Sequence, residues 1–413
     1  MKKVLLLTYN FPPEINGGVD RPYSLYKYLP DDGYEVTVIT TGRSDDVVVS
    51  NNIYHVPSVK HWSQGKFLSV STASWILSEL ISRLFLCPFA DIYWWFRAKK
   101  YFLEECCASN FDLIYASFPP IDTIFLACSL QKKTGTPLVI EFRDGLGCEP
   151  LLKNISARPL VRLFNRFVER RVVSNASLLV TIGRNMADYY KQAYPNLNVA
   201  TVYNGFLPDI ADRLRSPSTI NVIEKTRIAH FGSIGMSRRR SVVPLFKAVH
   251  ELKREGKINQ KNFILTFWGR FTKEEIKLVD DYDIGDVVSF REQVNKVSGL
   301  QEIMNDFSHV LLYGAAGDKT VVTSKIFDYL LVNKPILGIC SGNEVEALIR
   351  ESGLGDVCGF VVEEIKALFL SAIDGKTPFA PDHEYIEKFN RKNQAHEIAM
   401  LLNQVILREQ GSI

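Results

Sequence analysis

The first forty residues alternate short apolar runs with a loop and a helix-forming stretch. Residues 3–9 predict a buried strand, 10–18 a turn-rich loop, 21–29 a helix and 35–40 a second strand. This order favours a parallel, doubly wound sheet, because the crossover helix must pack on the sheet that it connects. The loop then lies at the carboxyl end of the first strand, where such sheets bind ligands.

The same alternation begins again after a polar stretch that contains two prolines. The chain has 413 residues, which is enough for two or three domains. We therefore predict an α/β fold with two Rossmann-like, doubly wound domains. The predicted parts are an N-terminal domain at 1–206, a linker at 207–225, a C-terminal domain at 226–382 and a C-terminal helix at 383–413.

Composition excludes several classes of protein. The net charge of +3 is too small to indicate nucleic-acid binding. The seven cysteines contain no C-x-x-C pair and the seven histidines lack metal-ligand spacing, so we predict no disulfide framework and no metal site. No uncharged apolar run approaches the roughly 20 residues of a membrane span, and the N-terminal run is too short for a signal peptide. The sequence therefore predicts a cytoplasmic protein.

Residues 323–339, TSKIFDYLLVNKPILGI, predict a helix followed by a buried strand. Thr323 and Ser324 are favoured N-cap types, and Asn333 is a residue that ends a helix in the left-handed conformation. A Lys-Pro pair then forbids continuation of the helix.

The start of this helix is a natural anion site, because unpaired amides and the helix dipole both favour phosphate there. The small-residue loop GAAG at 314–317 precedes it. Lys325 and Asp328, one turn apart, could hold a diphosphate and a ribose. The alternative, which the residues leave equally open, is an ordinary strand–helix unit whose Lys325 and Asp328 form a surface pair.

Two further loops carry glycines where a ligand could approach the backbone. Gly17 and Gly18 lie in the first loop, without the G-x-G-x-x-G pattern of a dinucleotide site. Gly232 opens a loop that ends in three arginines at 238–240, just before a predicted helix. The alternatives are a plain turn for the first loop and solvated arginines for the second.

Two segments suggest a surface for anionic lipid. Arg158, Arg162, Arg166 and Arg170 recur every four residues, on one face of a predicted amphipathic helix. The stretch 55–102 mixes many aromatic side chains with basic ones, which suits a membrane interface. The alternatives are a solvated arginine face paired with acids such as Glu169, and a helical insertion packed on its own domain.

The order and spacing of several motifs give the chain a family resemblance. They are KVLLLTYNFPPEINGGVDRPYSLYKYL, EVTVIT, DLIYASFPP, LVIEFRDG, ERRVVSNASLLVTI, VYNGF, IAHFGSIG and SKIFDYLLVNKPILG. Together they resemble the GT-B glycosyltransferases of the retaining group 1, or family 4. The resemblance implies two domains that face a cleft and a C-terminal helix that crosses back to the N-terminal domain. It also implies retaining sugar transfer from a nucleotide donor, without a metal or other cofactor.

The resemblance implies that the C-terminal half binds the nucleotide-sugar. Arg240, Lys325 and the amides around Ser324 would contact the diphosphate. Asp328 takes the place of the second glutamate in the family's E-x7-E motif, which binds the ribose, and Thr320 takes the place of the first. These two departures affect the expected contacts to the ribose and to the transferred sugar.

In the N-terminal half, Gly17 and Gly18 would approach the donor phosphate and the acceptor. Arg143 and Asp144 occupy the loop where many relatives have a histidine or an aspartate at the sugar. The histidine is absent, so Asp144 is the candidate catalytic carboxylate, with Arg143 beside it.

The sequence as a whole predicts a retaining glycosyltransferase that uses a UDP- or GDP-sugar. Its acceptor would be a lipid-linked or growing glycan in the synthesis of O-antigen, capsule or exopolysaccharide, on the inner face of the cell membrane. One alternative is a GT-B nucleotide-sugar epimerase or hydrolase. Another is a non-catalytic scaffold, which Thr320 in place of glutamate would suit. The sequence indicates neither the sugar nor the oligomeric state.

Overall fold

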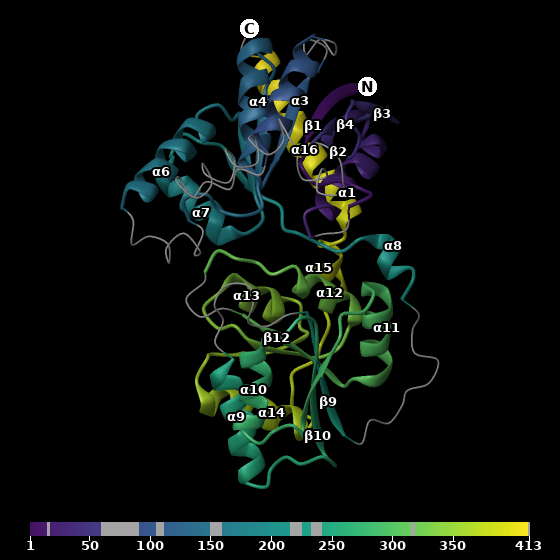
Figure 1. The fold of residues 1–413 in the computed structure, drawn as a ribbon, viewed down its shortest axis with the longest axis vertical. Helices are drawn as coiled ribbons and strands as arrows, with labels where there is room; N and C mark the ends of the chain where they lie inside the picture. The colour runs from purple at the N-terminus through teal and green to yellow at the C-terminus, as the bar shows by residue number, and fades with distance from the viewer. Residues whose placement is uncertain are drawn as a thin grey trace. The chain divides into compact units, whose positions relative to one another are not determined.

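The computed structural model describes residues 1–14, 17–58, 91–104, 111–148, 159–214, 225–232, 242–314 and 319–411. The chain divides into two compact units, Met1–Tyr203 with Arg391–Ile413, and Asn204–Asn390 (Figure 1). Each unit contains a parallel sheet covered by helices. The predicted α/β fold with two doubly wound domains is therefore confirmed.

The sheet of the first unit has its described strands in the order β3-β4-β2-β1-β5-β6-β7-β8. Neighbouring strands are parallel except β3 and β4. Because helices cover both faces, the central strands are apolar at nearly every position. The strands are β1 (Lys2–Leu7), β2 (Tyr34–Gly42), β3 (Val48–Ser50), β4 (Ile53–Pro57), β5 (Leu113–Phe118), β6 (Leu138–Phe142), β7 (Leu178–Thr181) and β8 (Val199–Thr201).

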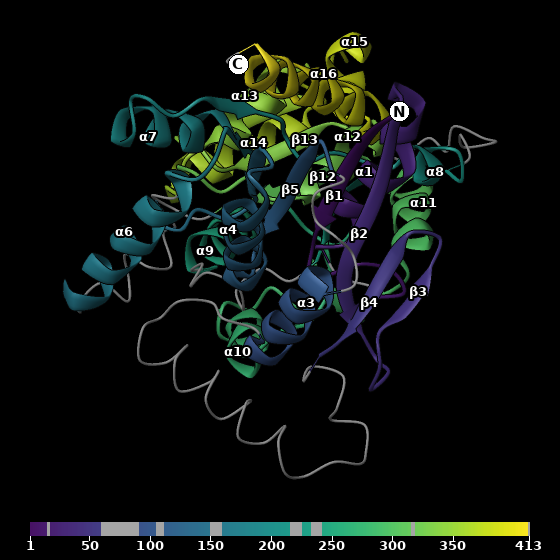
Figure 2. The same cartoon turned by 90° about the horizontal axis from the view of Figure 1, so that it is seen from above.

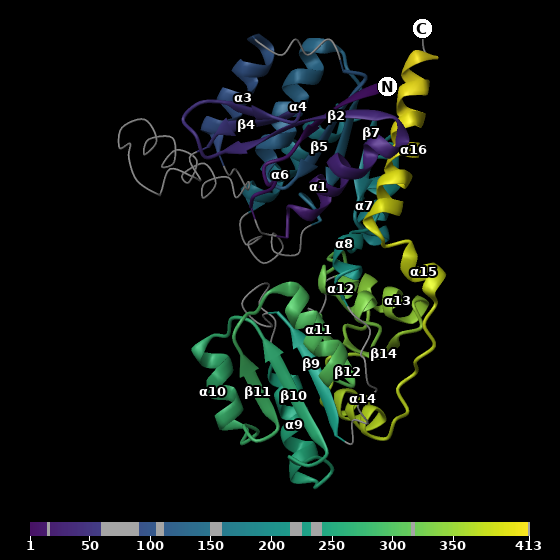
Figure 3. The same cartoon turned by 90° about the vertical axis from the view of Figure 1, so that its right-hand side faces the viewer.

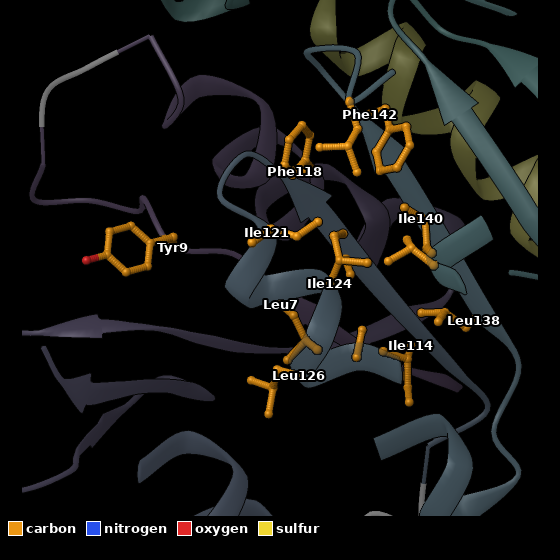
Figure 4. Close-up of a cluster of buried hydrophobic side chains, with 14 of the residues drawn as sticks. Leu7, Tyr9, Ile114, Phe118, Ile121, Ile124, Leu126, Leu138, Ile140 and Phe142 are labelled. Atoms are coloured by element: carbon orange, nitrogen blue, oxygen red, sulfur yellow. The ribbon is translucent and has the colours of Figure 1, made fainter. Parts of the chain in front are cut away.

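Helices cover the two faces of this sheet with separate hydrophobic cores. Leu7, Ile114 and Ile140 point to the face that α3, α4 and α6 cover (Figure 4), and α3 packs beside α4 (Figure 2). Val4 and Tyr115, on the same strands, point to the face that α1 and α16 cover. The helices are α1 (Asp20–Tyr28), η1 (Leu29–Asp32), α3 (Ile92–Glu104), α4 (Ile121–Thr134), α6 (Pro159–Val173), α7 (Arg184–Ala193) and α16 (Arg391–Gln410).

The end of the chain contains two helices where the sequence predicts one. Helix α15 (His383–Glu387) belongs to the second unit, and α16 packs beside α1 in the first (Figure 3). The break follows from backbone pairing, since the amide of Phe206 donates to the carbonyl of Phe389 at 2.9 Å. The hydroxyl of Tyr34 donates to the carbonyl of Ala399 at 3.2 Å and ties α16 to β2.

The sheet of the second unit is parallel, with its described strands in the order β11-β10-β9-β12-β13-β14. Its strands are β9 (Thr226–Phe231), β10 (Phe263–Trp268), β11 (Val288–Arg291), β12 (His309–Tyr313), β13 (Ile336–Ile339) and β14 (Gly355–Cys358). Its remaining helices are α8 (Pro208–Ala211), α9 (Val243–Arg254), α10 (Lys273–Asp281), α11 (Lys296–Asp306), α12 (Lys325–Val332), α13 (Glu344–Glu351) and α14 (Val362–Ile373). Helix α8 occupies part of the predicted linker, and residues 215–224 lie outside the described residues.

Each sheet has one place where the order of its strands reverses. In the first unit this switch point lies between β1 and β5, and in the second it lies between β9 and β12. Loops that leave the carboxyl ends of strands at a switch point diverge to opposite faces and leave room for a ligand. The predicted loops after β1 and β9 both start at such a point.

Candidate functional site

In the second unit, Gly232 and Lys325 lie in direct contact at the switch point. Gly232 follows β9 with φ +112°, and its amide donates to the carbonyl of Trp268 at 2.6 Å. A Cβ atom at position 232 would overlap Cε of Lys325 and lie 3.1 Å from its Nζ. The structure therefore brings together two of the residues predicted to bind the donor, with an ammonium group against the backbone of a strand end.

Helix α12 presents its N-terminus to the same strand end. Ser324 is its N-cap residue but makes no side-chain capping hydrogen bond, and Asn333 ends the helix at φ 51°, as predicted. The hydroxyl of Tyr329 accepts a hydrogen bond from the amide of Phe231 at 2.9 Å and donates to the carbonyl of Leu311 at 3.2 Å. This buried tyrosine fixes α12 against β9 and β12, and so fixes the position of Lys325.

Asp328 lies one turn after Lys325 and is 9% exposed. Its Oδ1 lies 2.7 Å from Nζ of Lys296, the first residue of α11. Lys296 was not predicted from the sequence, because nothing in the chain pattern pairs α11 with α12. The pair holds the carboxylate at the start of α12, where it can accept hydrogen bonds from hydroxyl groups of a ligand.

Two other predicted donor residues are described less fully or not at all. Thr320 lies between β12 and α12 and is partly exposed. Arg240 and the rest of 233–241 lie outside the described residues, as does 315–318.

In the first unit, Arg143 connects three loops at the switch point. It follows β6 and is 8% exposed. Its Nη1 donates to the carbonyl of Gly18 at 2.9 Å and its Nη2 donates to the carbonyl of Pro119 at 3.2 Å. Arg143 thus holds the loop after β1 against the loop after β5. A Cβ atom at position 17 would meet no described atom within 4 Å, so the backbone of Gly17 is open to a ligand.

A buried ion pair supports this arrangement and was missed in the sequence. Nε of Arg21 lies 2.7 Å from Oε1 of Glu141, and both side chains are fully buried. Tyr115 donates to Oε1 at 2.9 Å and Ser117 donates to Oε2 at 2.8 Å. Burial acts to raise the pKa of Glu141, but the charges of Arg21 and Arg143 and the hydrogen bonds from Ser117 and Arg21 together hold that pKa below its ordinary value. The signal in the sequence was a lone carboxylate in the buried strand LVIEF, which requires a partner.

Asp144 is partly exposed and immediately follows Arg143. Burial lowers the pKa of Arg143, although Glu141 and Asp144 both favour its charged form. The structure therefore associates Arg143 with loop positioning, while Asp144 is the more accessible of the two predicted catalytic residues.

The loop after Asp144 is anchored by Glu169. This carboxylate accepts hydrogen bonds from Tyr189 at 3.2 Å, Tyr190 at 3.0 Å and Tyr194 at 2.9 Å, and from the amide of Gly147. Burial raises the pKa of Glu169. Glu169 therefore belongs to a buried tyrosine cluster, which corrects the alternative that it pairs with the predicted arginine stripe.

Helix α6 carries part of that stripe on an exposed face. Arg166, Arg170 and Arg171 are exposed there, together with Leu163 at 67% and Phe167 at 65%. Arg158 and the side chain of Arg162 lie outside the described residues.

The aromatic stretch at 55–102 is described only at its ends, because 59–90 lies outside the described residues. On α3, Trp94 and Phe102 are buried in the core, and Phe96 is 61% exposed. Helix α3 therefore packs on its own unit, as the alternative interpretation has it. Within the described ranges, no helix is long and apolar enough to cross a membrane, and no three His, Cys, Asp or Glu side chains form a group that could hold a metal.

Comparisons with known proteins identify a matching family model and similar folds. Residues 16–205 match a family model described as "Glycosyl transferase 4-like domain". A sequence search of curated proteins finds no match. Among solved structures, the chain is similar to sucrose-phosphate synthase from Thermosynechococcus elongatus, with 13% identity and a TM-score of 0.64 over 99% of this chain and 100% of that one.

Two further structures are similar at the same level. One is an alpha,alpha-trehalose-phosphate synthase (UDP-forming) from Burkholderia xenovorans in complex with glucose-6-phosphate, with 11% identity and a TM-score of 0.63 over 98% of this chain and 100% of that one. The other is the lipopolysaccharide outer core galactosyltransferase WaaB in its apo form, with 11% identity and a TM-score of 0.59 over 97% of this chain and 99% of that one. At these identities the likeness establishes the fold.

Fold and family model together define the class of protein: the chain is a glycosyltransferase with the GT-B fold. The glycosyl transferase 4-like domain of that family model occupies residues 16–205 of the 413 residues.

Proposed function

We propose that the chain transfers a sugar, with retention at the anomeric carbon, from a nucleotide-sugar to a glycan acceptor. The observation that supports this most is Lys325 lying against Gly232 at the switch point of the second unit. Cleavage of a sugar–diphosphate bond builds negative charge on the leaving phosphate. A fixed ammonium group and helix-end amides stabilise that charge without a metal.

The donor is proposed to be a UDP- or GDP-sugar bound by the second unit. Asp328, held by Lys296, would accept hydrogen bonds from the ribose hydroxyls, and Lys325 would contact the diphosphate. Arg240, Thr320 and the amides around Ser324 keep the roles that the family resemblance implies.

The acceptor side is proposed to use the first unit. Gly17 has open space at its backbone, and Arg143 holds the Gly18 loop in place. The partly exposed Asp144 would stabilise the positive charge of an oxocarbenium-like sugar.

The biological role is proposed to be extension of an envelope glycan, such as O-antigen, capsule or exopolysaccharide, on a lipid carrier at the inner face of the cell membrane. Two observations support it. One structural neighbour is a lipopolysaccharide outer core galactosyltransferase. The exposed face of α6 combines Leu163 and Phe167 with arginines, which suits an anionic lipid surface.

Thermal unfolding with UDP, GDP, ADP, CMP and their sugars, with and without magnesium, tests the donor site. One nucleotide series should raise the melting temperature without metal, because a ligand of the native state stabilises it. Lys325→Met should weaken this binding about 10- to 100-fold, through loss of a charged hydrogen bond. Lys257→Met, an exposed lysine of the same unit, is the matched control. No shift with any nucleotide at millimolar concentration would favour a non-catalytic scaffold.

The reaction itself is tested by following the anomeric proton of the sugar by NMR. A retaining transferase gives a product with the anomeric configuration of the donor, and its rate depends on the acceptor. Sugar release or donor epimerisation at full rate without any acceptor would replace the proposal with the epimerase or hydrolase alternative.

A further inference from the structure

The backbone around Asp144 is held on both sides. Before it, the amide of Arg143 donates to the carbonyl of Phe118, at the end of β5, at 3.0 Å. After it, the amide of Leu146 donates to the hydroxyl of Tyr190 at 3.3 Å, and the Leu146 side chain is buried in the core. Asp144 and one further residue lie between these two fixed points. The position of the Asp144 carboxylate therefore depends on how firmly the chain after it is anchored.

The anchor is the carboxylate of Glu169, on α6. Its Oε2 accepts from Tyr190 at 3.0 Å, and the amide of Gly147 donates to the same carboxylate. Its Oε1 accepts from Tyr189 at 3.2 Å and from Tyr194 at 2.9 Å. Glu169 is 1% exposed, and these donors fill the roughly four acceptor sites of a carboxylate. Such a buried and fully bonded group fixes its surroundings, because each lost bond leaves a polar group unpaired.

Gly147 approaches this anchor too closely for any side chain. A Cβ atom at position 147 would lie 2.5 Å from Oε2 of Glu169 and 2.5 Å from the hydroxyl oxygen of Tyr189. The glycine is not required by its backbone conformation, since its φ lies outside the left-handed region. An alanine at this position would therefore disturb the contact between loop and anchor without straining the backbone.

Two of the tyrosines differ in what they connect. Tyr190 is fully buried on α7 and bonds both to Glu169 and to the amide of Leu146, so it reaches the loop. Tyr194 is the residue at which α7 ends and is partly exposed. In the described part of the chain, its hydroxyl bonds to Glu169 and to no residue of the loop. The pair offers a matched comparison between the two sides of the anchor.

We propose that Glu169 is a positioning residue for sugar transfer, which together with Tyr190 holds the loop 144–147 and so sets the place of the Asp144 carboxylate. This rests on the proposed function, in which Asp144 stabilises positive charge on the sugar. A reacting group that is displaced by about 1 Å can slow a reaction about 100-fold. The donor is bound by the second unit, so its binding does not depend on Glu169.

Glu169→Gln in the whole chain tests this role. Glutamine keeps the size of the side chain, but its amide nitrogen cannot accept a bond from Gly147 or from a tyrosine. The kcat of transfer should fall about 10- to 100-fold, because the Asp144 carboxylate is no longer held in place. The KM for the nucleotide-sugar should stay unchanged, which a general loss of folded protein would not explain for the remaining active fraction.

Tyr190→Phe and Tyr194→Phe separate positioning from stability. Each variant removes one hydrogen bond to Glu169. Tyr190→Phe also removes the acceptor of the Leu146 amide, so its kcat should fall, whereas Tyr194→Phe should keep the kcat of the wild type. Thermal unfolding of both variants records what each lost bond costs in stability.

Gly147→Ala covers the case in which Glu169→Gln does not fold. It keeps the carboxylate and all three tyrosines and displaces only the loop, so kcat should fall by a similar factor. Gly285→Ala is the matched control, because that glycine also lies outside the left-handed region and its Cβ would meet only an ordinary contact, 3.7 Å from Val279.

Hydrogen exchange over residues 144–148 measures the anchor without any activity. In the wild type the amides of Leu146 and Gly147 should be protected by their bonds. In Glu169→Gln they should exchange at least about tenfold faster, because the loop opens locally, while exchange in α4 stays unchanged.

Three results would overturn the proposal. Unchanged exchange over 144–148 in Glu169→Gln would show that Glu169 does not hold the loop. Faster exchange with an unchanged kcat would show that the loop does not set the rate. Equal losses of kcat in Tyr190→Phe and Tyr194→Phe would assign the cluster a purely structural role. A wild type that transfers no sugar would contradict the proposed function, and with it the role in transfer, while faster exchange in Glu169→Gln would still establish the anchor.

Discussion

The switch points of the two units differ in how deeply their charged side chains are buried. In the first unit the strand ends are joined by fully buried charges, with Glu141 bonded to Arg21, Tyr115 and Ser117. In the second unit a glycine with φ +112° meets a lysine, and the aspartate nearby pairs with a partly exposed Lys296. The same topology thus has a fully buried ion pair in one unit and a partly exposed lysine in the other.

This difference separates side chains that fix the position of loops from side chains that bind a ligand. A buried network that is fully bonded fixes its loops and costs much free energy to break. Charges at a partly exposed strand end contribute little to stability. Substitutions of the buried Arg21–Glu141 pair should therefore change folding, and substitution of Lys325 should change donor binding.

The largest effect is expected for Glu141→Gln. Removal of the carboxylate leaves Arg21 buried without its charge partner, which should lower the free energy of unfolding by about 3–5 kcal/mol. Denaturant unfolding measures it. The double variant Arg21→Met with Glu141→Gln should recover most of the loss, because no charge is then left unpaired. A loss below about 1 kcal/mol for Glu141→Gln would mean that the first unit does not depend on this pair.

As the pH falls, the stability of the second unit should decrease at a higher pH than that of the first. Burial, with Lys334 nearby, lowers the pKa of His309 to about 4. The unfolded chain binds that proton near pH 6.5 and the folded chain only near pH 4, so stability falls as the pH drops through this window. The full loss is about 3 kcal/mol. Glu141, whose pKa is held low, loses its contribution only as the pH falls below the ordinary range of a glutamate.

Hydrogen exchange followed by mass spectrometry measures this difference unit by unit. Between pH 6.5 and 4.5, after correction for intrinsic exchange, protection should fall in the second unit and hold in the first. His309→Gln should flatten the dependence in the second unit, since glutamine does not titrate. An unchanged pH dependence in that variant would show that another group controls it.

A smaller effect on stability and a larger one on binding are expected for Gly232→Ala. The positive φ strains an alanine, and its Cβ would displace Cε of Lys325. The unfolding free energy should fall by about 1–2 kcal/mol, and nucleotide binding should weaken as it does in Lys325→Met. Calorimetric titration of the nucleotide measures the binding. Gly256→Ala, at another positive φ with open space around its Cβ, controls for backbone strain alone.

The contrast between the units also explains what the sequence could predict. The alternation of apolar runs and helices is local, so it predicted both sheets and the loops at their ends. Lys325, Asp328 and Gly232 were each predicted as site residues, because helix starts and strand-end glycines have local signatures.

Pairings across the sheet could not be predicted in the same way. Arg21 and Glu141 are 120 residues apart, and only the finished sheet brings them together. The bond from Lys296 to Asp328 and the tyrosine cluster around Glu169 likewise depend on how helices pack. The single helix predicted for 383–413 is two helices, because Phe389 pairs with Phe206 far back in the chain.

The smallest effect on stability is expected on the exposed face of α6, which belongs to neither switch point. Leu163→Ser with Phe167→Ser should change the unfolding free energy by less than about 0.5 kcal/mol, since both side chains are already in water. Flotation with anionic vesicles should nevertheless lose the bound fraction, because these side chains would enter the lipid while the arginines hold its headgroups. Leu407→Ser, a 63% exposed leucine on α16, is the control and should float as the wild type does. If the wild type stays with the soluble fraction, the protein does not bind anionic lipid through α6, and its acceptor is bound in solution. The comparison between the two units does not depend on this result.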